Sequence, residues 1–341
     1  MENPANLHVV GRTADGRIWH TIRSPTAWTP FGNVLAAARR LDLEGLGAVV
    51  DIAAARCAGV GLNGHPEGLY VLLALNSGPP VLLFRSADTG QWSQEASGYF
   101  SRARRVAAAI SFIVSQGAGP ARSELHLAVT TDDGYLMTAI HQHGSGSPDV
   151  PVDVEWSAGD RGEHRAVALL GQGAIDAAHT TARLLTATAD GRMYVTTGAP
   201  GAWEPFTDVE SAGAGERGDF VDVAIASGSS KTDYFGVTGD GRVWLASENN
   251  SATWQQWRDL EEINKVVGGG PWTWKTTEIA DVGTFVRVAA ATTSEGEHVL
   301  GVTSNGHLFH QLRASAPGQF RDVEAVGVGQ DVGSFTAVAC A

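Results

Sequence analysis

Two tryptophans in a glycine-rich segment have the chemistry to hold a ring-shaped ligand. Trp272 and Trp274 lie in the sequence GGGPWTWK at positions 268–275. The three glycines give the backbone wide conformational freedom, and an indole offers a broad apolar face with one N–H donor. The segment therefore predicts a lid or a stacking platform for a sugar. The alternative is a loop that tucks one tryptophan over neighbouring structure.

Two histidines stand at equivalent places in the sequence. His20 and His310 each follow a turn residue, Asp15 or Asn305, by five positions. A neutral imidazole can donate one hydrogen bond and accept another, so we expect both side chains to contact a ligand. Equivalent positions on neighbouring repeats are too far apart to share an ion, and no metal site is predicted.

Two tryptophans and two arginines complete the candidate ligand contacts. Trp19 and Trp244 each stand four positions after the Asp of a turn, where packing within the fold is the alternative role. Arg39 and Arg40 lie in segment 34–47, whose alanines and leucines predict a short helix. The two guanidinium groups could bind an anionic ligand, or could simply be solvated.

Composition narrows the class of partner. The net charge of −13 disfavours binding to nucleic-acid phosphates and favours a neutral ligand, a cation or a basic protein partner. The sequence contains no run of about 18 apolar residues, so no membrane span is expected. The N-terminal MENPAN lacks the basic start and apolar core of a signal peptide. We expect a protein that is cytoplasmic or released without a recognisable signal peptide; the sequence indicates no oligomeric state.

Motifs for catalysis and cofactor binding are absent from the sequence. It contains no G-x-S-x-G turn, phosphate-binding glycine loop or H-E-x-x-H pair, so no cofactor is expected. Cys57 and Cys340 are too few for a disulfide framework and are expected to be buried thiols. A set of acidic residues near predicted turns could supply general acids, bases or calcium ligands: Asp133, Asp160, Asp190, Asp240, Glu261 and Glu262. The alternative for the turn aspartates is a structural role in type I′ turns.

Repeated short strands must position these candidates. An apolar strand rich in Ala and Val recurs at 49–55, 105–110, 165–170, 220–226, 285–291 and 335–341. A second strand follows at 69–75, 125–130, 184–188, 234–238, 299–303 and 7–13. Then comes a two-residue Asp-Gly or Asn-Gly turn, the strongest short hairpin signal, at 15–16, 133–134, 190–191, 240–241 and 305–306.

Bulky aromatic residues mark the outer part of each repeat. Fourth strands are predicted to start near Trp28, Trp92, Trp156, Trp203, Trp254 and Phe320. The five tryptophans of this set occupy one repeated position, which predicts packing between neighbouring repeats.

The last repeat is split between the two ends of the chain. Residues 334–341 match 284–291, where a repeat begins, and the rest of that repeat lies at the N-terminus. Joining them seals an otherwise open sheet edge. The sequence therefore predicts a single all-β domain, a six-bladed β-propeller with four antiparallel strands per blade. The C-terminal strand completes the first blade (1–46 plus 332–341), and the other blades span 47–100, 101–162, 163–217, 218–282 and 283–331.

A resemblance to a known family points the same way. TADGRIWH at 13–20, followed by AWTPF at 27–31, resembles the repeats of tectonin-type propellers and related bacterial propeller lectins. FVDVA at 220–224 and TGDGRVW at 238–244 have the same layout. Members that are lectins bind neutral or methylated sugars in shallow pockets between blades, so the resemblance implies a binding protein.

We predict a ligand-binding propeller, a carbohydrate-binding lectin that uses grooves between blades and the loop bearing Trp272 and Trp274. One alternative is an enzyme (a lyase, cyclase or hydrolase) with an asymmetric site at the channel mouth, because such sites leave little linear signature. Another is a protein-interaction platform, which a large exposed apolar patch would favour.

Overall fold

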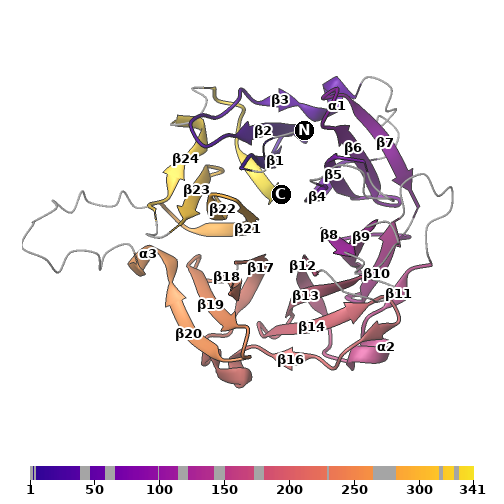
Figure 1. Cartoon of the computed structure of the whole chain (residues 1–341), viewed down its shortest axis with the longest axis vertical. Coiled ribbons are helices and arrows are strands. Elements are labelled where there is room, and N and C mark those ends of the chain that lie inside the picture. Colours follow the sequence, from indigo (N-terminus) through magenta and orange to yellow (C-terminus); the bar gives the residue numbers. More distant parts are fainter. Residues whose placement is uncertain are drawn as a thin grey trace, which may run out of the picture.

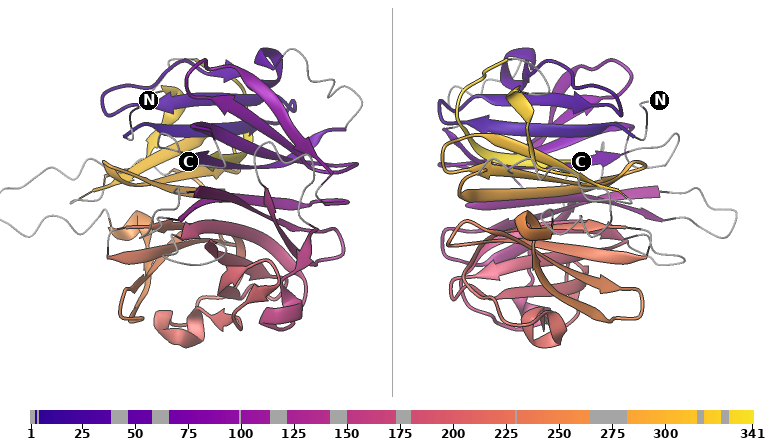
Figure 2. Two further views of the ribbon diagram at one scale, coloured as in Figure 1. Left: turned by 45° about the vertical axis from the view of Figure 1, so that its right-hand side comes forward. Right: turned by 90° about the vertical axis from the view of Figure 1, so that its left-hand side faces the viewer.

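The strands form six sheets arranged as blades around a central opening (Figure 1). The computed structural model describes residues 3, 5–38, 47–57, 66–98, 100–113, 122–141, 150–172, 180–228, 230–263, 282–314, 318–325 and 330–341. In the turned views of Figure 2 the strands cross the thickness of the ring, so that the turns lie at its two faces. The predicted six-bladed β-propeller is confirmed.

The first three blades, each from the channel outwards, have the following strands. Blade 1 contains β25 (Phe335–Cys340), β1 (Leu7–Thr13), β2 (Ile18–Arg23) and β3 (Gly32–Asn33). Blade 2 contains β4 (Val49–Cys57), β5 (Gly68–Leu75), β6 (Val81–Ser86) and β7 (Trp92–Ser97). Blade 3 contains β8 (Arg105–Ile113), β9 (Arg122–Thr130), β10 (Leu136–His141) and β11 (Val152–Asp153).

The other three blades repeat this order. Blade 4 contains β12 (His164–Gln172), β13 (Thr181–Thr188) and β14 (Met193–Ala199), with β15 (Ala202–Trp203) and β16 (Thr207–Asp208) both paired to β14. Blade 5 contains β17 (Phe220–Ser227), β18 (Lys231–Thr238), β19 (Val243–Asn249) and β20 (Trp254–Asp259). Blade 6 contains β21 (Phe285–Thr293), β22 (Gly296–Thr303), β23 (Leu308–Arg313) and β24 (Arg321–Asp322).

The C-terminal strand closes the ring as the sequence predicts. β25 pairs antiparallel with β1 from Val9↔Cys340 to Thr13↔Phe335, and Figure 1 shows the C-terminus beside the central opening. Because β25 fills the inner position of blade 1, β1 has partners on both edges. Cys340 and Cys57 are both buried free thiols, as predicted.

The core is divided among the six seams, a seam being the contact between two neighbouring blades. Each of six clusters of buried apolar side chains draws its members from two adjacent blades. Small residues line the channel because six strands approach one another there: Ala53, Ala54, Ala107, Ala108, Ala168, Ala224, Ala289, Ala290 and Ala339.

The Asp-Gly turns differ from the predicted type I′ geometry. Gly16 lies in the left-handed region at φ 83°, whereas Asp15 is not among the residues with positive φ. The Gly16 N–H bonds to the Thr13 carbonyl at 2.9 Å, which makes a type I turn followed by a glycine bulge. The Thr13 hydroxyl donates to Asp15 at 2.6 Å and holds the aspartate in this right-handed conformation.

Fourth strands run into short helical turns, through a repeated motif that the sequence reading missed. An Asp or Asn side chain accepts a backbone N–H from a residue two or three positions ahead, at Asn33, Asp153, Asp208 and Asp259. Such side chains favour helix starts for this reason. The turns are α1 (Val34–Ala37), α2 (Glu155–Ala158), the π-helical η1 (Glu210–Ala214) and α3 (Leu260–Ile263).

That motif corrects one prediction about an aromatic residue. Trp156 does not start a fourth strand: it follows Asp153 inside α2 and is 88% exposed. A fourth strand does start beside Phe320, because β24 begins at Arg321. The error at Trp156 came from aligning aromatic residues without the Asp that ends each strand.

Candidate functional site

A groove of about 620 Å³ lies at the seam between blades 6 and 1. One wall is the β2–β3 connection of blade 1, and the other comes from β23 and β24 of blade 6. Its lining mixes aromatic and polar side chains, including Arg23, Trp28, His310, Gln319, Arg321 and Asp322. A concave site with an aromatic surface and a few polar groups is typical of small-ligand binding.

A tight hairpin holds Trp28 at the groove. Trp28 forms an isolated bridge with Arg23, and the Ser24 N–H bonds to the Ala27 carbonyl at 2.8 Å. Trp28 packs against the buried cluster of this seam. Its indole meets the His310 ring edge-on, with ring centroids 5.4 Å apart and planes at 84°. The structure therefore brings His310, a predicted ligand residue, together with Trp28, which the sequence predicts to pack between neighbouring repeats.

A hydrogen-bonded chain fixes the imidazole of His310. Its Nε2 lies 2.9 Å from Nδ1 of His298, and Nε2 of His298 lies 2.9 Å from the Thr293 hydroxyl. When the Thr293 hydroxyl donates to Nε2 of His298, Nδ1 of His298 donates in turn to Nε2 of His310. His310 then carries its own proton on Nδ1, where it can act as a donor. This N–H has no hydrogen-bond partner among the described residues.

Burial keeps His298 and His310 neutral. Burial and then the positive charge of Arg23 lower the pKa of His298 to about 4. Burial, then the neighbouring His298 and then Arg23 lower the pKa of His310 to about 3. Arg23 reaches across the seam to form an ion pair with Glu295 of blade 6. The groove therefore presents an uncharged imidazole at neutral pH, beside an arginine whose charge is already paired.

We expect acid to destabilise the fold through these histidines. An unfolded histidine takes up a proton near its ordinary pKa of about 6.5, whereas folded His298 does so near pH 4. The unfolded state thus binds more protons between these values, and the free energy of unfolding falls as the pH is lowered through them. Replacing His298 with Asn should remove on the order of 3 kcal/mol of this loss.

Urea unfolding of the wild type and His298→Asn at pH 6.5 and pH 4 measures that difference. His307→Asn serves as the control, because the His307 side chain is 56% exposed. Equal pH dependence in the wild type and His298→Asn would contradict the neutral buried pair.

The neighbouring seam, between blades 1 and 2, repeats the arrangement. Nδ1 of His8 lies 3.0 Å from Nε2 of His20, and His20 meets Trp92 edge-on with centroids 5.6 Å apart. His20 is 8% exposed. The predicted residues His20 and His310 thus occupy equivalent positions in two adjacent seams.

Trp19 and Trp244 lie at a different repeated position, in the scaffold. The indole N–H of each donates to a threonine hydroxyl of its own blade, Thr13 at 3.3 Å and Thr238 at 3.1 Å. The guanidinium of Arg217 covers the Trp244 ring at 3.8 Å from its centroid. Neither tryptophan lines the groove between blades 6 and 1.

The remaining candidates, Trp272, Trp274, Arg39 and Arg40, lie outside the described residues. Their assignment as ligand contacts stays a prediction. Helix α1 covers only the start of the segment that leads to the two arginines.

Two of the turn aspartates, Asp190 and Asp240, are engaged in local structure. The hydroxyls of Thr188 and Thr238 donate to Asp190 and Asp240 at 2.5 and 2.6 Å, and these bonds lower the pKa of both carboxyl groups. These contacts fit the structural alternative for the turn aspartates, although the turn type differs.

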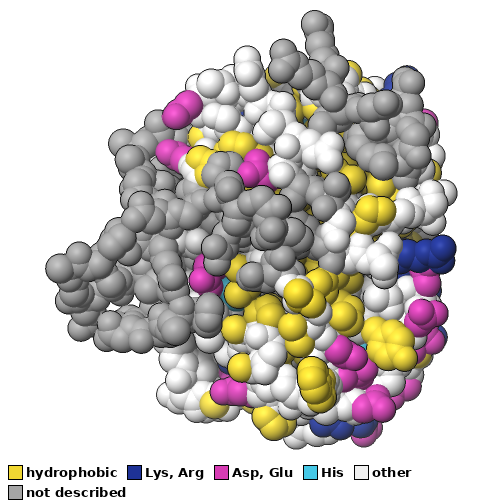
Figure 3. Space-filling model, turned by 90° about the vertical axis from the view of Figure 1, so that its right-hand side faces the viewer, with side chains coloured by type: hydrophobic (Ala, Val, Ile, Leu, Met, Phe, Trp, Pro, Cys, Tyr) yellow, Lys and Arg dark blue, Asp and Glu magenta, His cyan; other side chains and the backbone are white. Residues whose placement is uncertain are grey.

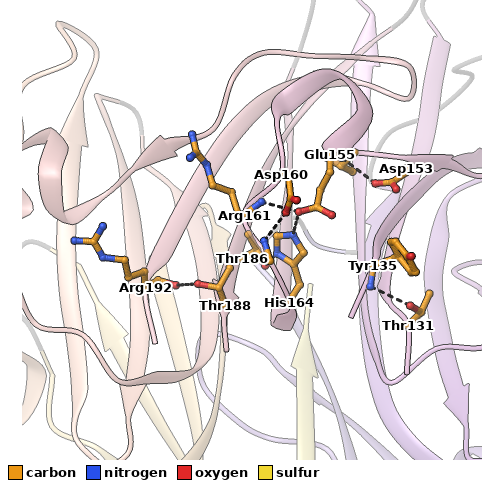
Figure 4. Close-up of polar contacts among 12 residues, drawn as sticks. Thr131, Tyr135, Asp153, Glu155, Asp160, Arg161, His164, Thr186, Thr188 and Arg192 are labelled. Carbon is orange, nitrogen blue, oxygen red and sulfur yellow. Dashed lines mark hydrogen bonds and ion pairs between the residues drawn. The ribbon is translucent and has the colours of Figure 1, made fainter. Parts of the chain in front are cut away.

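At the seam between blades 3 and 4, a carboxylate contacts a buried histidine (Figure 4). Nε2 of His164 lies 3.2 Å from Glu155, and its Nδ1 lies 2.9 Å from the Thr186 hydroxyl. Glu155 also accepts the backbone N–H of Arg161 at 2.8 Å. Burial lowers the pKa of His164. Because the ring is fully buried, we assign this group to the packing of the seam.

A carboxyl pair lies at the seam between blades 5 and 6. Glu297 is hydrogen-bonded to Asp233, and burial together with that neighbouring charge raises the pKa of Glu297 to about 8. Arg313 lies 3.3 Å from Glu297 and 3.7 Å from Asp233. Neither acid lines the groove between blades 6 and 1.

Two further findings concern the described part of the chain. It contains no cluster of three or more His, Cys, Asp or Glu side chains that could hold a metal ion. None of its helices has the length and hydropathy needed to cross a membrane.

Comparison with known proteins supports the fold. No protein-family model and no curated protein matches the sequence. Among solved structures, AofleA from Arthrobotrys oligospora has a TM-score of 0.58 at 12% identity, over 98% of this chain and 86% of that chain. A variant of the Aleuria aurantia lectin in complex with Fucalpha1-6GlcNAc has a TM-score of 0.58 at 12% identity, over 96% and 94%. The BP39L lectin from Burkholderia pseudomallei has a TM-score of 0.55 at 14% identity, over 94% and 96%. At these identities the chain is similar to the three proteins in fold.

Proposed function

We propose that the protein is a lectin that binds carbohydrate in the groove between blades 6 and 1. The observation that carries the proposal is the Trp28–His310 pair at the groove, an aromatic face beside an imidazole whose Nδ1 has no hydrogen-bond partner among the described residues. A sugar ring has C–H faces that pack on an indole, and hydroxyl groups that hydrogen-bond to the surrounding polar side chains.

The rim of the groove suits a ligand with many hydroxyl groups. Gln319, Arg321 and Asp322 line it on the side of blade 6, and Ser24 and Thr26 line it on the side of blade 1. Their side chains include both hydrogen-bond donors and acceptors, as a sugar requires. Two of the similar proteins are named as lectins, and one of them is seen in complex with Fucalpha1-6GlcNAc, which makes a fucoside the first ligand to test.

A glycan array probed with the labelled full chain tests this proposal. We expect saturable binding to a defined set of sugars, competed by the free monosaccharide of that set. A blank array across neutral, methylated and acidic glycans would remove carbohydrate binding as the function.

One observation favours a second candidate, a protein-binding surface on blade 3. Trp156, Val150 and Tyr135 are 88%, 81% and 53% exposed. Figure 3 shows hydrophobic side chains gathered beside acidic ones on this side of the ring. Large exposed apolar groups mark interaction sites, and a second copy of the chain is the simplest occupant. Sedimentation analysis should then show self-association that Trp156→Ala abolishes; a monomeric wild type would remove this candidate.

A further inference from the structure

Two ion pairs of equivalent geometry face each other at the mouth of the central channel. Asp51 on β4 pairs with Arg105 on β8 at 3.7 Å, and Asp222 on β17 pairs with Arg287 on β21 at 3.9 Å. Each aspartate follows the bulge of its inner strand, in blades that lie three places apart in the ring.

The two aspartates are already used to join blades. Oδ2 of Asp51 accepts the Val106 N–H at 3.1 Å, and Oδ2 of Asp222 accepts the Val288 N–H at 2.8 Å. Each bond connects an inner strand to the inner strand of the next blade. Each carboxylate therefore pairs with an arginine and also joins two neighbouring blades.

A third guanidinium, that of Arg12, lies near the two Asp–Arg pairs and interacts with Asp51 and Arg287. Arg12 on β1 donates to the Thr336 hydroxyl at 2.6 Å. The Nε atoms of Arg12 and Arg287 are buried and have no hydrogen-bond partner among the described residues. Burial lowers the pKa of Arg12 and of Arg105; Asp51 raises both values in part, and the charge of Arg287 lowers both. Arg12 therefore adds a third guanidinium to the two Asp–Arg pairs.

Two of the three arginines line cavities at the channel mouth, and Arg12 lines neither cavity. Arg287 lines the channel cavity of about 100 Å³ and also a second cavity of about 360 Å³, which Arg104 and Arg105 line as well. The whole chain carries a net charge of −13, so this concentration of arginine is opposite in sign to the rest of the molecule. Guanidinium groups present planar pairs of N–H donors that match the oxygens of an oxyanion.

We propose that Arg12, Arg105 and Arg287 form a binding site for a small oxyanion at the mouth of the central channel. Sulfate, phosphate and a carboxylate share the required chemistry: two or more oxygens that carry negative charge. One bound anion would offset the third positive charge. This site is distinct from the groove between blades 6 and 1, and it does not depend on carbohydrate binding.

Thermal unfolding in the presence of sodium sulfate, phosphate or acetate tests the site, with sodium chloride at equal ionic strength as the reference. A ligand that binds only the folded state raises the unfolding temperature; we expect a saturable rise of about 3 °C by about 10 mM of the preferred anion. Comparing the rise in sulfate and phosphate with the rise in acetate shows whether the site prefers a tetrahedral anion or a carboxylate.

Two variants and one control locate the effect. Arg12→Gln leaves both Asp–Arg pairs in place and should lose the rise, as should Arg287→Gln. The control, Arg192→Gln, removes one positive charge from the Arg192–Asp208 ion pair of blade 4 and should keep the rise. Calorimetric titration of the preferred anion into wild type and Arg12→Gln repeats the comparison for folded protein, should Arg287→Gln fail to fold.

Either of two results would overturn the proposal. The first is a wild-type response to all three oxyanions that equals the response to chloride. The second is a rise that persists in Arg12→Gln, because the anion would then act elsewhere on the surface.

Discussion

Deleting residues 335–341 is expected to abolish cooperative folding of the ring. The deletion removes β25, whose Phe335 is 2% exposed and whose Val338 is 7% exposed, and it opens the inner edge of β1. Burying one large apolar side chain stabilises a protein by roughly 1.5–3 kcal/mol. Losing several of them together with five backbone pairings is comparable with a whole folding free energy of about 5–15 kcal/mol. Circular dichroism during urea unfolding measures the outcome.

A matched pair of point variants tests the same closure without truncation. A Cβ on Gly11 would lie 2.4 Å from the Phe335 ring, whereas one on Gly32 would lie 3.9 Å from its nearest neighbour, the His20 carbonyl. Gly11→Ala should therefore destabilise the protein strongly, and Gly32→Ala should be tolerated. A truncated chain that unfolds with the wild-type midpoint would show that the ring closes without β25.

Trp28→Ala is expected to weaken glycan binding by roughly ten- to a hundredfold while leaving the fold intact, because removing an aromatic anchor typically costs about 2 kcal/mol. Trp28 is only partly buried, so its removal opens little of the core. Calorimetric titration with the best glycan from the array measures the change. The matched control is Trp156→Ala, which removes the same side chain from an exposed position on α2.

Unchanged affinity in Trp28→Ala would move the site away from this groove. The equivalent seam between blades 1 and 2 would then be tested with Trp92→Ala, because Trp92 contacts His20 as Trp28 contacts His310. Loss of binding in Trp92→Ala would then assign the ligand to that seam.

The repeat spacing was enough to predict the architecture, because a propeller places the same strand order in every blade. The Asp-Gly spacing predicted six blades, and the split repeat predicted that β25 completes blade 1. Local geometry was harder to predict. The turn type depends on a hydrogen bond between Thr13 and Asp15. Trp156 matches the aromatic pattern of a fourth strand, but that strand ends at Asp153, whose side chain accepts the backbone N–H of Glu155.

The candidate site was predicted only in part, for a physical reason. His310 was singled out by its spacing, but Trp28 lies 282 positions earlier and meets it only when blade 6 closes against blade 1. Repeat position also misled us: Trp28 and Trp203 share one position, yet Trp203 is 4% exposed and donates to Thr138. Whether such a tryptophan is available depends on the neighbouring blade, which differs from seam to seam.

The most direct test of the central claim is a crystal structure of the protein with the best glycan from the array. We predict a sugar ring packed against Trp28, with a hydroxyl oxygen within hydrogen-bond distance of Nδ1 of His310. A sugar bound only elsewhere on the ring, with the groove between blades 6 and 1 empty, would contradict the account.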